Sequence, residues 1–336
     1  MNKRLLITLT TAIFLLIATM IAIKLAKGYR PDLKNGSLKA TGLLLANSIP
    51  RGAQVFINDK LMTATDDTLN LSPDEYEVKI KKTGYLPWHK KIRVQAELVT
   101  ETNARLFPSV PEMKPLTLAG VSQPLVSPDG SKIFFSSELG FWVLEMVTRP
   151  LTNPKPKKIS QPEINLVYQK WGKEKEIEDV IRFDKFPLEF QQIATDSAKI
   201  VNFSPDETKL LYLAKENVEI PQDLIPKIPS ASSQPEERNI KANVLYVYDR
   251  KEDRNFKIHE ALENISWFPD SRHLLFISDG KIKIIEYDGQ NETIIYAGIF
   301  EEDFFAIWPD DSRLVVLTNL NPDSPLLPNL YAINLR

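Results

Sequence analysis

The hydrophobic and polar positions of this 336-residue chain follow three successive patterns, and the first lies at the N-terminus. The stretch from Leu5 to Ile23 carries no charged residue over nineteen positions. At ~1.5 Å rise per residue, a helix of this length crosses most of a ~30 Å hydrocarbon layer. We therefore expect a transmembrane helix, with the lipid bilayer as its partner through Leu5–Ile23.

The same stretch leaves alternatives open. A secretory signal peptide begins in a similar way, and Ala26–Gly28 resembles a cleavage site, but the apolar run exceeds the usual core of about 7 to 15 residues. More basic residues follow the span than precede it, which by the positive-inside rule favours a cytoplasmic body. Large domains are nevertheless often translocated. We expect a retained anchor over 1–27, a tether over 28–39 and an extracytoplasmic body.

The second pattern covers residues 40–107 and consists of short alternating runs separated by turn residues. Alternation with a period of two places every second side chain on one face of a sheet. The side chains expected on that face are Val55, Ile57, Tyr76, Val78, Ile80, Ile92 and Val94. The pattern predicts a small antiparallel β domain.

The residues of this segment resemble the PEGA domain family. The resemblance rests on Ile-Pro-Arg-Gly-Ala-Gln-Val-Phe-Ile-Asn at 49–58, Leu-Ser-Pro-Asp-Glu-Tyr-Glu-Val-Lys-Ile at 71–80 and Gly-Tyr-Leu-Pro-Trp at 84–88. Arg51 and Asp74 depart from the family pattern, standing in place of a glutamate and a glycine. The resemblance implies a β-sandwich of the kind found in bacterial surface proteins, with no shared active site.

Trp88 is the candidate binding residue of this domain, and two interpretations compete for it. An exposed indole stacks on a sugar ring, whereas a buried indole closes one end of a sandwich core. The core interpretation is favoured, because an isolated aromatic residue after a turn more often packs inside the protein.

A third pattern follows a proline-rich linker over 108–118. An apolar strand, a Pro-Asp pair, a polar turn and another apolar strand recur four times. The recurring residues, which we interpret as structural turn residues, are Pro128, Asp129, Pro205, Asp206, Pro269, Asp270, Pro309 and Asp310. The repeats resemble the WD40-like repeats of TolB and dipeptidyl-peptidase propellers, in which a Ser-Pro-Asp-Gly turn recurs once per blade.

The third copy predicts four strands, at 265–268, 273–278, 281–288 and 293–297, which is one propeller blade. The resemblance and the repeat together predict a β-propeller over 119–336 with about five blades, four to six being permitted. The residues near 216–241, rich in proline, serine and charge, are expected to form a mobile inserted loop. A hidden blade with strands at Leu166–Trp171 and Val180–Phe183 would fill the longest interval between copies.

Composition and charge add exclusions. A net charge of −2 argues against a nucleic-acid partner, and the chain has no cysteine for a disulfide or thiolate site. The three histidines, His89, His259 and His273, are far apart in the sequence. The acidic tracts, including Glu301–Asp303, are interpreted as solvated surface, and the repeated aspartates as turn residues instead of calcium ligands. We expect no catalytic residues, no metal and no cofactor.

The sequence thus predicts a mainly β protein, anchored in the bacterial cell membrane by a single span. We expect a binding or scaffold protein of the envelope whose propeller presents a face to a protein or a cell-wall glycan. The alternative is a membrane-tethered hydrolase acting on cell-wall carbohydrate. A cytoplasm-facing sensor subunit is a third possibility.

Overall fold

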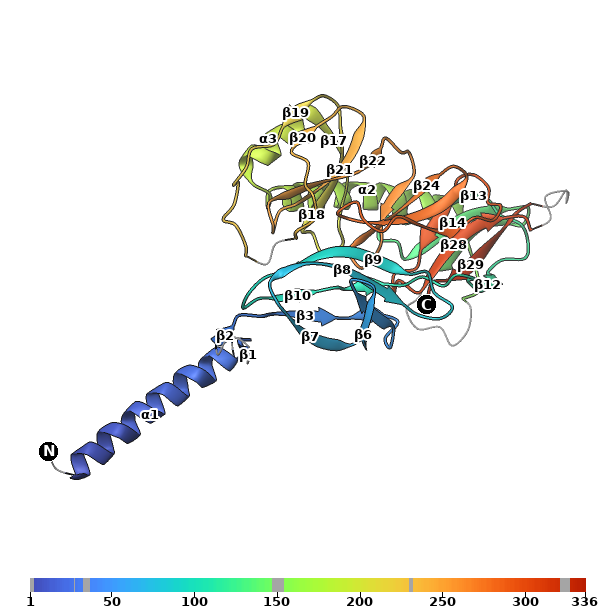
Figure 1. The fold of residues 1–336 in the computed structure, drawn as a ribbon. Helices are drawn as coiled ribbons and strands as arrows, with labels where there is room; N and C mark the ends of the chain where they lie inside the picture. Colours follow the sequence, from blue (N-terminus) through green and yellow to red (C-terminus); the bar gives the residue numbers. More distant parts are fainter. Residues whose placement is uncertain (1–2, 27, 33–36, 147–153, 230–231, 321–326) are drawn as a thin grey trace. The chain divides into compact units, whose positions relative to one another are not determined.

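The structure, a computed structural model, confirms a mainly β chain with an N-terminal apolar helix (Figure 1). It describes residues 3–26, 28–32, 37–146, 154–229, 232–320 and 327–336. The chain divides into two compact units. The first comprises residues 1–83, 87–106 and 229–233, and the second comprises 84–86, 107–228 and 234–336.

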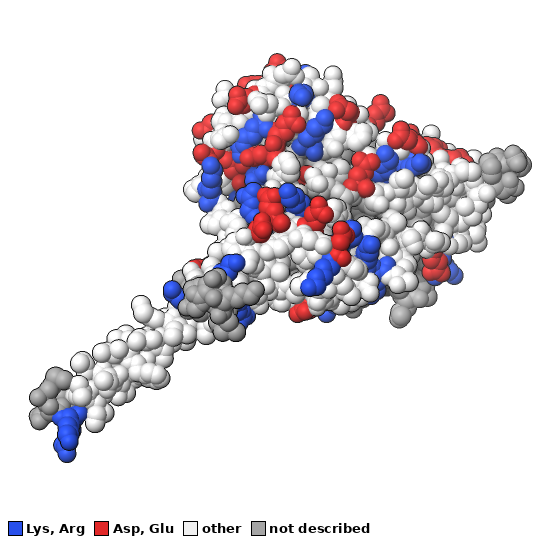
Figure 2. All heavy atoms as spheres, in the orientation of Figure 1, with Lys and Arg blue, Asp and Glu red and all other residues white. Residues whose placement is uncertain are grey.

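Helix α1 (Lys3–Ala26) contains the expected span. Its 21 residues from Leu6 to Ala26 have a mean hydropathy of 2.5, and none of the span is buried inside the protein. Figure 2 shows basic side chains at the N-terminal end of the helix and uncharged surface along its length. The hydroxyls of Thr8, Thr11 and Thr19 each donate to the carbonyl oxygen four residues earlier. The helix therefore satisfies these polar groups internally, as a lipid environment requires.

The first unit also holds the small β domain. One sheet has the strand order β6-β5-β8-β9 and another the order β10-β3-β7, in which β10 and β3 are parallel. The strands are β1 (Arg30–Asp32), β2 (Ser37–Lys39), β3 (Gly42–Ala46), β4 (Ser48–Ile49), β5 (Gln54–Ile57), β6 (Lys60–Ala64), β7 (Asp67–Leu71), β8 (Asp74–Lys81), β9 (Trp88–Val94), β10 (Val99–Glu101) and β11 (Ala104–Arg105).

The alternating pattern of this domain is confirmed. Six of the seven side chains expected on the buried face are at most 6% exposed, and they lie on β5, β8 and β9. They are Val55, Ile57, Val78, Ile80, Ile92 and Val94. Tyr76 is only half-buried, and its hydroxyl donates to the carbonyl oxygen of Ser72, which lies between β7 and β8. The apolar face therefore forms the core, while the outward face of β8 and β9 carries charged residues.

The second unit is built from four-stranded antiparallel sheets, of which its described residues contain four. In chain order the first three are β13-β14-β15-β16, β17-β18-β21-β22 and β23-β24-β25-β26, and the fourth is β12-β29-β28-β27. The strands are β12 (Met113–Pro115), β13 (Ser122–Val126), β14 (Lys132–Ser137), β15 (Gly140–Glu145), β16 (Lys157–Ile159), β17 (Ala198–Phe203), β18 (Lys209–Ala214), β19 (Val218–Glu219), β20 (Asn239–Ile240), β21 (Val244–Asp249), β22 (Arg254–Glu260), β23 (Ile265–Trp267), β24 (His273–Ser278), β25 (Lys281–Glu286), β26 (Thr293–Tyr296), β27 (Phe305–Ile307), β28 (Arg313–Thr318) and β29 (Asn329–Asn334).

Buried clusters join these sheets side by side. One cluster packs Leu245 of the second sheet with Phe276 of the third, and another packs Leu275 of the third with Val316 of the fourth. A further cluster brings Val315 of the fourth sheet against Phe135 of the first. The sheets therefore follow one another face to face like propeller blades.

The linker expected over 108–118 is wrong in part, because it contains a strand of the propeller. Met113 pairs with Ile333 and Pro115 with Tyr331. Strand β12 therefore joins the fourth sheet, whose other three strands come from the C-terminal end of the chain. The prolines suggested a stiff linker, yet β12 is an edge strand, where a missing N–H group costs little.

The strands expected at Leu166–Trp171 and Val180–Phe183 are also wrong. This interval forms helix α2 (Gln161–Phe183) and helix α3 (Leu188–Ser197). Two local features support α2. At its start, the Ser160 N–H donates to Glu163 Oε2 at 2.9 Å, which is typical of a helix N-terminus. Near its end, Glu178 and Arg182 pair at helical spacing. Four sheets and a helical segment thus stand where about five blades were expected.

The two helices cover different sheets. On α2, Tyr168 and Trp171 pack against Phe134 of the first sheet, with ring centroids 5.7 and 5.8 Å away. On α3, Phe190 stacks on Tyr248 of the second sheet at 3.8 Å. The helical segment therefore bridges the first and second sheets.

The segment near 216–241 lies between β18 and β21, and it is not simply a mobile loop. Strands β19 and β20 pair with each other, and Ile220 and Ile240 are buried in the cluster beneath α3. Arg238 pairs with Asp253 at 3.2 Å, and both side chains are largely buried. The polar composition of the segment predicted a loop, because only a few residues anchor the segment to the second sheet. Residues 230–231 of the predicted loop lie outside the residues that the structure describes.

Candidate functional site

The four Pro-Asp pairs form equivalent turns directly after β13, β17, β23 and β27, which we call the inner strands. In each turn the aspartate Oδ1 accepts the backbone N–H of the residue two positions later. These donors are Ser131, Thr208, Arg272 and Ser312, at 3.1, 3.1, 2.8 and 3.1 Å respectively. The aspartates therefore act on their own backbone, as Asx-type turns require.

The residue after each aspartate has a left-handed backbone. Gly130, Glu207, Ser271 and Asp311 have φ between 59° and 67°. Only the first copy has the glycine that this conformation favours. In all four copies, the N–H of this residue donates to the carbonyl oxygen three residues earlier, which closes the turn.

Hydrogen bonds join neighbouring sheets at both ends of the inner strands. At the turn end, Ser271 Oγ accepts the N–H of Asp206 at 2.9 Å, which joins the third and second sheets. At the opposite end, Asn264 Nδ2 donates to the carbonyl oxygen of Asp303 at 3.4 Å, which joins the third and fourth sheets.

Between these ends lies a cavity of about 820 Å³, which we call the axial cavity. Residues from the inner strands β13, β17, β23 and β27 line it, together with the four turn prolines and Arg182 of α2. Its volume falls in the range of about 300–1,000 Å³ that holds small ligands or short segments. The four sheets and α2 therefore share one site.

The charged lining residues differ between the two ends. Glu263, Glu302 and Asp303 precede β23 and β27, and we call these three the acidic rim. Their side chains are exposed. At the turn end, Arg182 pairs with Glu178 at 2.9 Å and with Glu207 at 3.2 Å.

The pKa shifts at the turn end agree with the geometry. Burial raises the pKa of Asp206, but hydrogen bonds from Ser204 and Thr208 and the nearby Lys209 outweigh burial, so its pKa falls below the usual value. The pKa of Asp129 is lowered in the same way by Ser127 and Ser131. Ionised turn aspartates are the better acceptors for their N–H groups.

A third carboxylate nearby shifts in the opposite direction. Burial raises the pKa of Asp249, although Lys209, 3.8 Å away, acts to lower it. Lys209 also lies 4.7 Å from the ring centroid of Tyr287. This buried group supports the second sheet and does not line the cavity.

Trp88 is 2% exposed, so its ring is not available to stack on a sugar. This corrects its standing as a candidate binding residue and fits the core interpretation. Among the histidines, His89 is exposed, while His273 is buried and its Nδ1 lies 2.7 Å from Asp270 Oδ2. His273 therefore belongs to the third turn.

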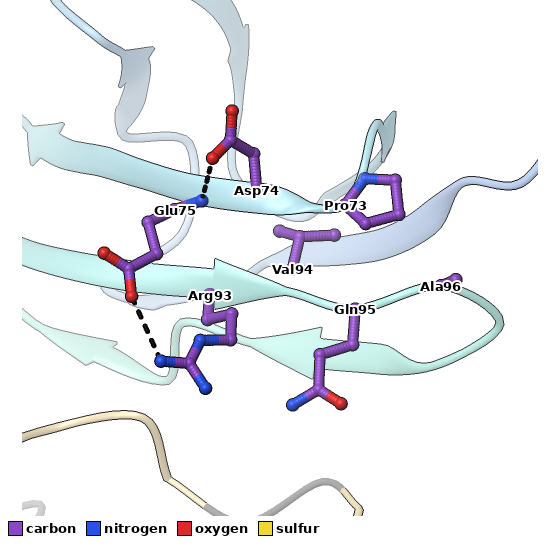
Figure 3. Close-up of a pocket in the computed structure, with 7 residues that line it drawn as sticks. All are labelled: Pro73, Asp74, Glu75, Arg93, Val94, Gln95 and Ala96. Atoms are coloured by element: carbon purple, nitrogen blue, oxygen red, sulfur yellow. Dashed lines mark hydrogen bonds and ion pairs between the residues drawn. The ribbon is translucent and has the colours of Figure 1, made fainter.

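A second hollow, of about 400 Å³, lies in the small β domain at the ends of β8 and β9. Figure 3 shows Arg93 donating to Glu75 at its side, a contact of 3.1 Å. Lys91 and Arg93 lower the pKa of Glu75 through these contacts. Because Arg93 and Glu75 already pair with each other, this hollow is a weaker candidate than the axial cavity.

The sequence singled out the four turn prolines that line the cavity, but not the rim carboxylates or Arg182. Glu302 and Asp303 belong to a tract interpreted as solvated surface, and Arg182 was assigned to a strand. Glu263, Glu302 and Asp303 stand just before β23 and β27, and only the arrangement of the sheets turns this position into a cavity wall.

The solved structures similar to this chain share little sequence with it, and their TM-scores are low. A structure of TolB from Acinetobacter baumannii has 14% identity, covering 76% of this chain and 48% of that chain, with a TM-score of 0.22. An uncharacterized protein from Listeria monocytogenes EGD-e has 15% identity, covering 77% and 60%, with a TM-score of 0.24. Oligogalacturonate lyase from Vibrio parahaemolyticus has 8% identity, covering 91% and 96%, with a TM-score of 0.25. These likenesses carry no functional argument.

No curated protein matches the chain. The family comparison is specific, because the PEGA domain model matches residues 41–109, close to the expected 40–107. The chain therefore contains a PEGA domain at residues 41–109.

Proposed function

We propose that this chain is a membrane-anchored, extracytoplasmic binding protein of the bacterial envelope, which holds part of a protein or cell-wall glycan in the axial cavity. The observation that carries the proposal is a single cavity of about 820 Å³ lined by the inner strands of all four sheets. Loops at the ends of packed sheets are free to vary without loss of the fold.

Two further observations support the location. Helix α1 has the length and composition of a membrane span, and the PEGA domain directly follows the tether. In this proposal α1 anchors the chain, and the axial cavity binds the partner.

The test blocks the cavity by volume. Ser266 lies on β23, lines the cavity and is half-buried, so Ser266→Trp would fill space without changing charge. The full-length chain and the variant, each with a C-terminal tag, are used to capture proteins and glycans from solubilised bacterial envelopes. Thr195→Trp is the matched control, because Thr195 is exposed on α3 and lies outside the cavity lining.

We expect a partner that the wild-type chain and Thr195→Trp capture equally and Ser266→Trp does not. Equal capture by all three would refute the cavity as the binding site. The same preparations are incubated with purified cell-wall glycan. Turnover that Ser266→Trp abolishes would replace binding with the hydrolase alternative.

A further inference from the structure

We propose that the ligand of the axial cavity is an extended, positively charged peptide segment of a partner protein, bound through the acidic rim. This inference rests on the proposed function and names the ligand class. It is carried by the contrast between the two ends of the cavity and by the apolar wall between them.

The rim carboxylates are exposed and lie on loops of two neighbouring sheets. Glu263, Glu302 and Asp303 come from two neighbouring sheets, whose loops meet where Asn264 donates to the Asp303 carbonyl oxygen. Within the part of the chain that the structure describes, no ion pair joins any of the three to a basic side chain. Three negative charges therefore face the opening together.

The basic residue in the described lining does not offset this charge. Arg182 lies at the turn end, where Glu178, Asp179 and Glu207 surround it. Burial acts to lower the pKa of Arg182, but the contacts with Glu207 and Asp179 outweigh burial and raise this pKa above its usual value. The guanidinium therefore stays charged and paired. The potential at the rim is therefore negative, and it attracts cations.

The wall between the ends suits the stem of a lysine or arginine side chain. Leu125 is 52% exposed, and Ile265, Phe305 and Ile307 are half-buried, all on inner strands that line the cavity. Lysine and arginine place their methylene stems on apolar surface and keep the charged group near water or acids. The cavity is large enough for a few extended residues and too small for a folded domain.

A glycan fits the same wall less well. Sugar recognition commonly uses an open aromatic face, whereas Trp267, which lines the cavity, is 6% exposed and donates through Nε1 to the Asn202 carbonyl oxygen at 3.3 Å. A glycan ligand is therefore an alternative outcome of the test.

The experiment uses the full-length chain in nanodiscs of zwitterionic phosphatidylcholine, which do not themselves attract cationic peptides. Fluorescence anisotropy measures the binding of labelled tetralysine, tetraglutamate and a neutral N-acetylglucosamine oligomer. The rim variant is Glu263→Gln/Glu302→Gln/Asp303→Asn. The matched control is Glu138→Gln/Glu176→Gln/Asp196→Asn, which removes the same charges from exposed positions outside the cavity lining.

We expect tetralysine to bind the wild-type chain, and the rim variant to bind it about tenfold more weakly, a loss of about 1.4 kcal/mol. The control variant should retain wild-type affinity, and tetraglutamate should not bind. If the rim variant loses its far-UV circular dichroism, Glu302→Gln alone is measured, with a loss of about twofold expected.

Three results would overturn the inference: no binding of tetralysine, equal loss in the rim and control variants, or preferential binding of the oligosaccharide. None of these results contradicts the proposed function, which is tested by whether Ser266→Trp prevents capture of the partner. Conversely, a partner that Ser266→Trp still binds would remove the proposed function and this inference with it.

Discussion

The segment between β18 and β21 provides the sharpest test of the fold, because the sequence and the structure assign it different roles. Asp253 holds it against the second sheet. Its Oδ2 accepts the N–H of Leu224 at 2.8 Å, while its Oδ1 accepts the Tyr248 hydroxyl at 2.8 Å and Arg238 Nη1 at 3.2 Å. Substitution of Asp253 by alanine removes all three contacts.

The magnitude follows from burial. Asp253 and Arg238 side chains are 7% and 10% exposed, and removal of one partner of a buried ion pair costs about 3–5 kcal/mol. Arg238 keeps a contact with Glu236 at 3.1 Å, so we expect the lower end, about 3 kcal/mol. Asp253→Asn retains an acceptor and the side-chain volume, and should lose about 1–2 kcal/mol.

Urea unfolding of the full-length chain, followed by tryptophan fluorescence, gives the free energy of unfolding. Hydrogen exchange at Val218–Ile220 and Arg238–Ile240 reports whether the segment detaches first. Asp196→Ala, an exposed change on α3, is the control and should stay within about 0.5 kcal/mol of wild type. A loss below about 1 kcal/mol for Asp253→Ala, with unchanged exchange in the segment, would refute the anchoring role.

Three further predictions concern other parts of the chain. Trp88→Ala should lower the free energy of unfolding by about 3–5 kcal/mol, measured by denaturant titration, because the ring is buried. The stability difference between wild type and Asp206→Asn should be full above pH ~4 and vanish as the pH falls, measured by thermal melting; the folded pKa lies below the unfolded value of 3.8, so the carboxylate loses its stabilising charge on acidification. Deletion of Leu6–Ala26 should release the chain from the carbonate-washed membrane fraction, and protease should remove a C-terminal tag from intact spheroplasts of the full-length protein.

Periodicity predicted the strands well, because alternation directly reports one buried face. The third repeat shows this most clearly: strands were expected at 265–268 and 273–278, and the structure has them at Ile265–Trp267 and His273–Ser278. The turns were also accessible from sequence, since proline and aspartate have fixed local roles.

Helix α2 was missed because its apolar residues do not face a single core. Ile177, Val180 and Ile181 are all more than half exposed, so the run lacks the stripe that marks a packed helix. The short apolar runs within it are compatible with strands when judged alone. The start signal at Ser160 and Glu163 was the stronger evidence, and it favoured a helix.

The cavity could not be predicted for a different reason, which also explains where a ligand is to be sought. A repeat reveals residues that have the same role in every copy. In the structure, each repeated aspartate accepts a backbone N–H of its own turn. A carboxylate held in this way is fixed within its own turn. The charged groups that we propose for recognition lie outside the repeated motif, namely Glu263, Glu302 and Asp303. Because each occurs once, no repeat marks them, and only the arrangement of the sheets around one cavity brings them together.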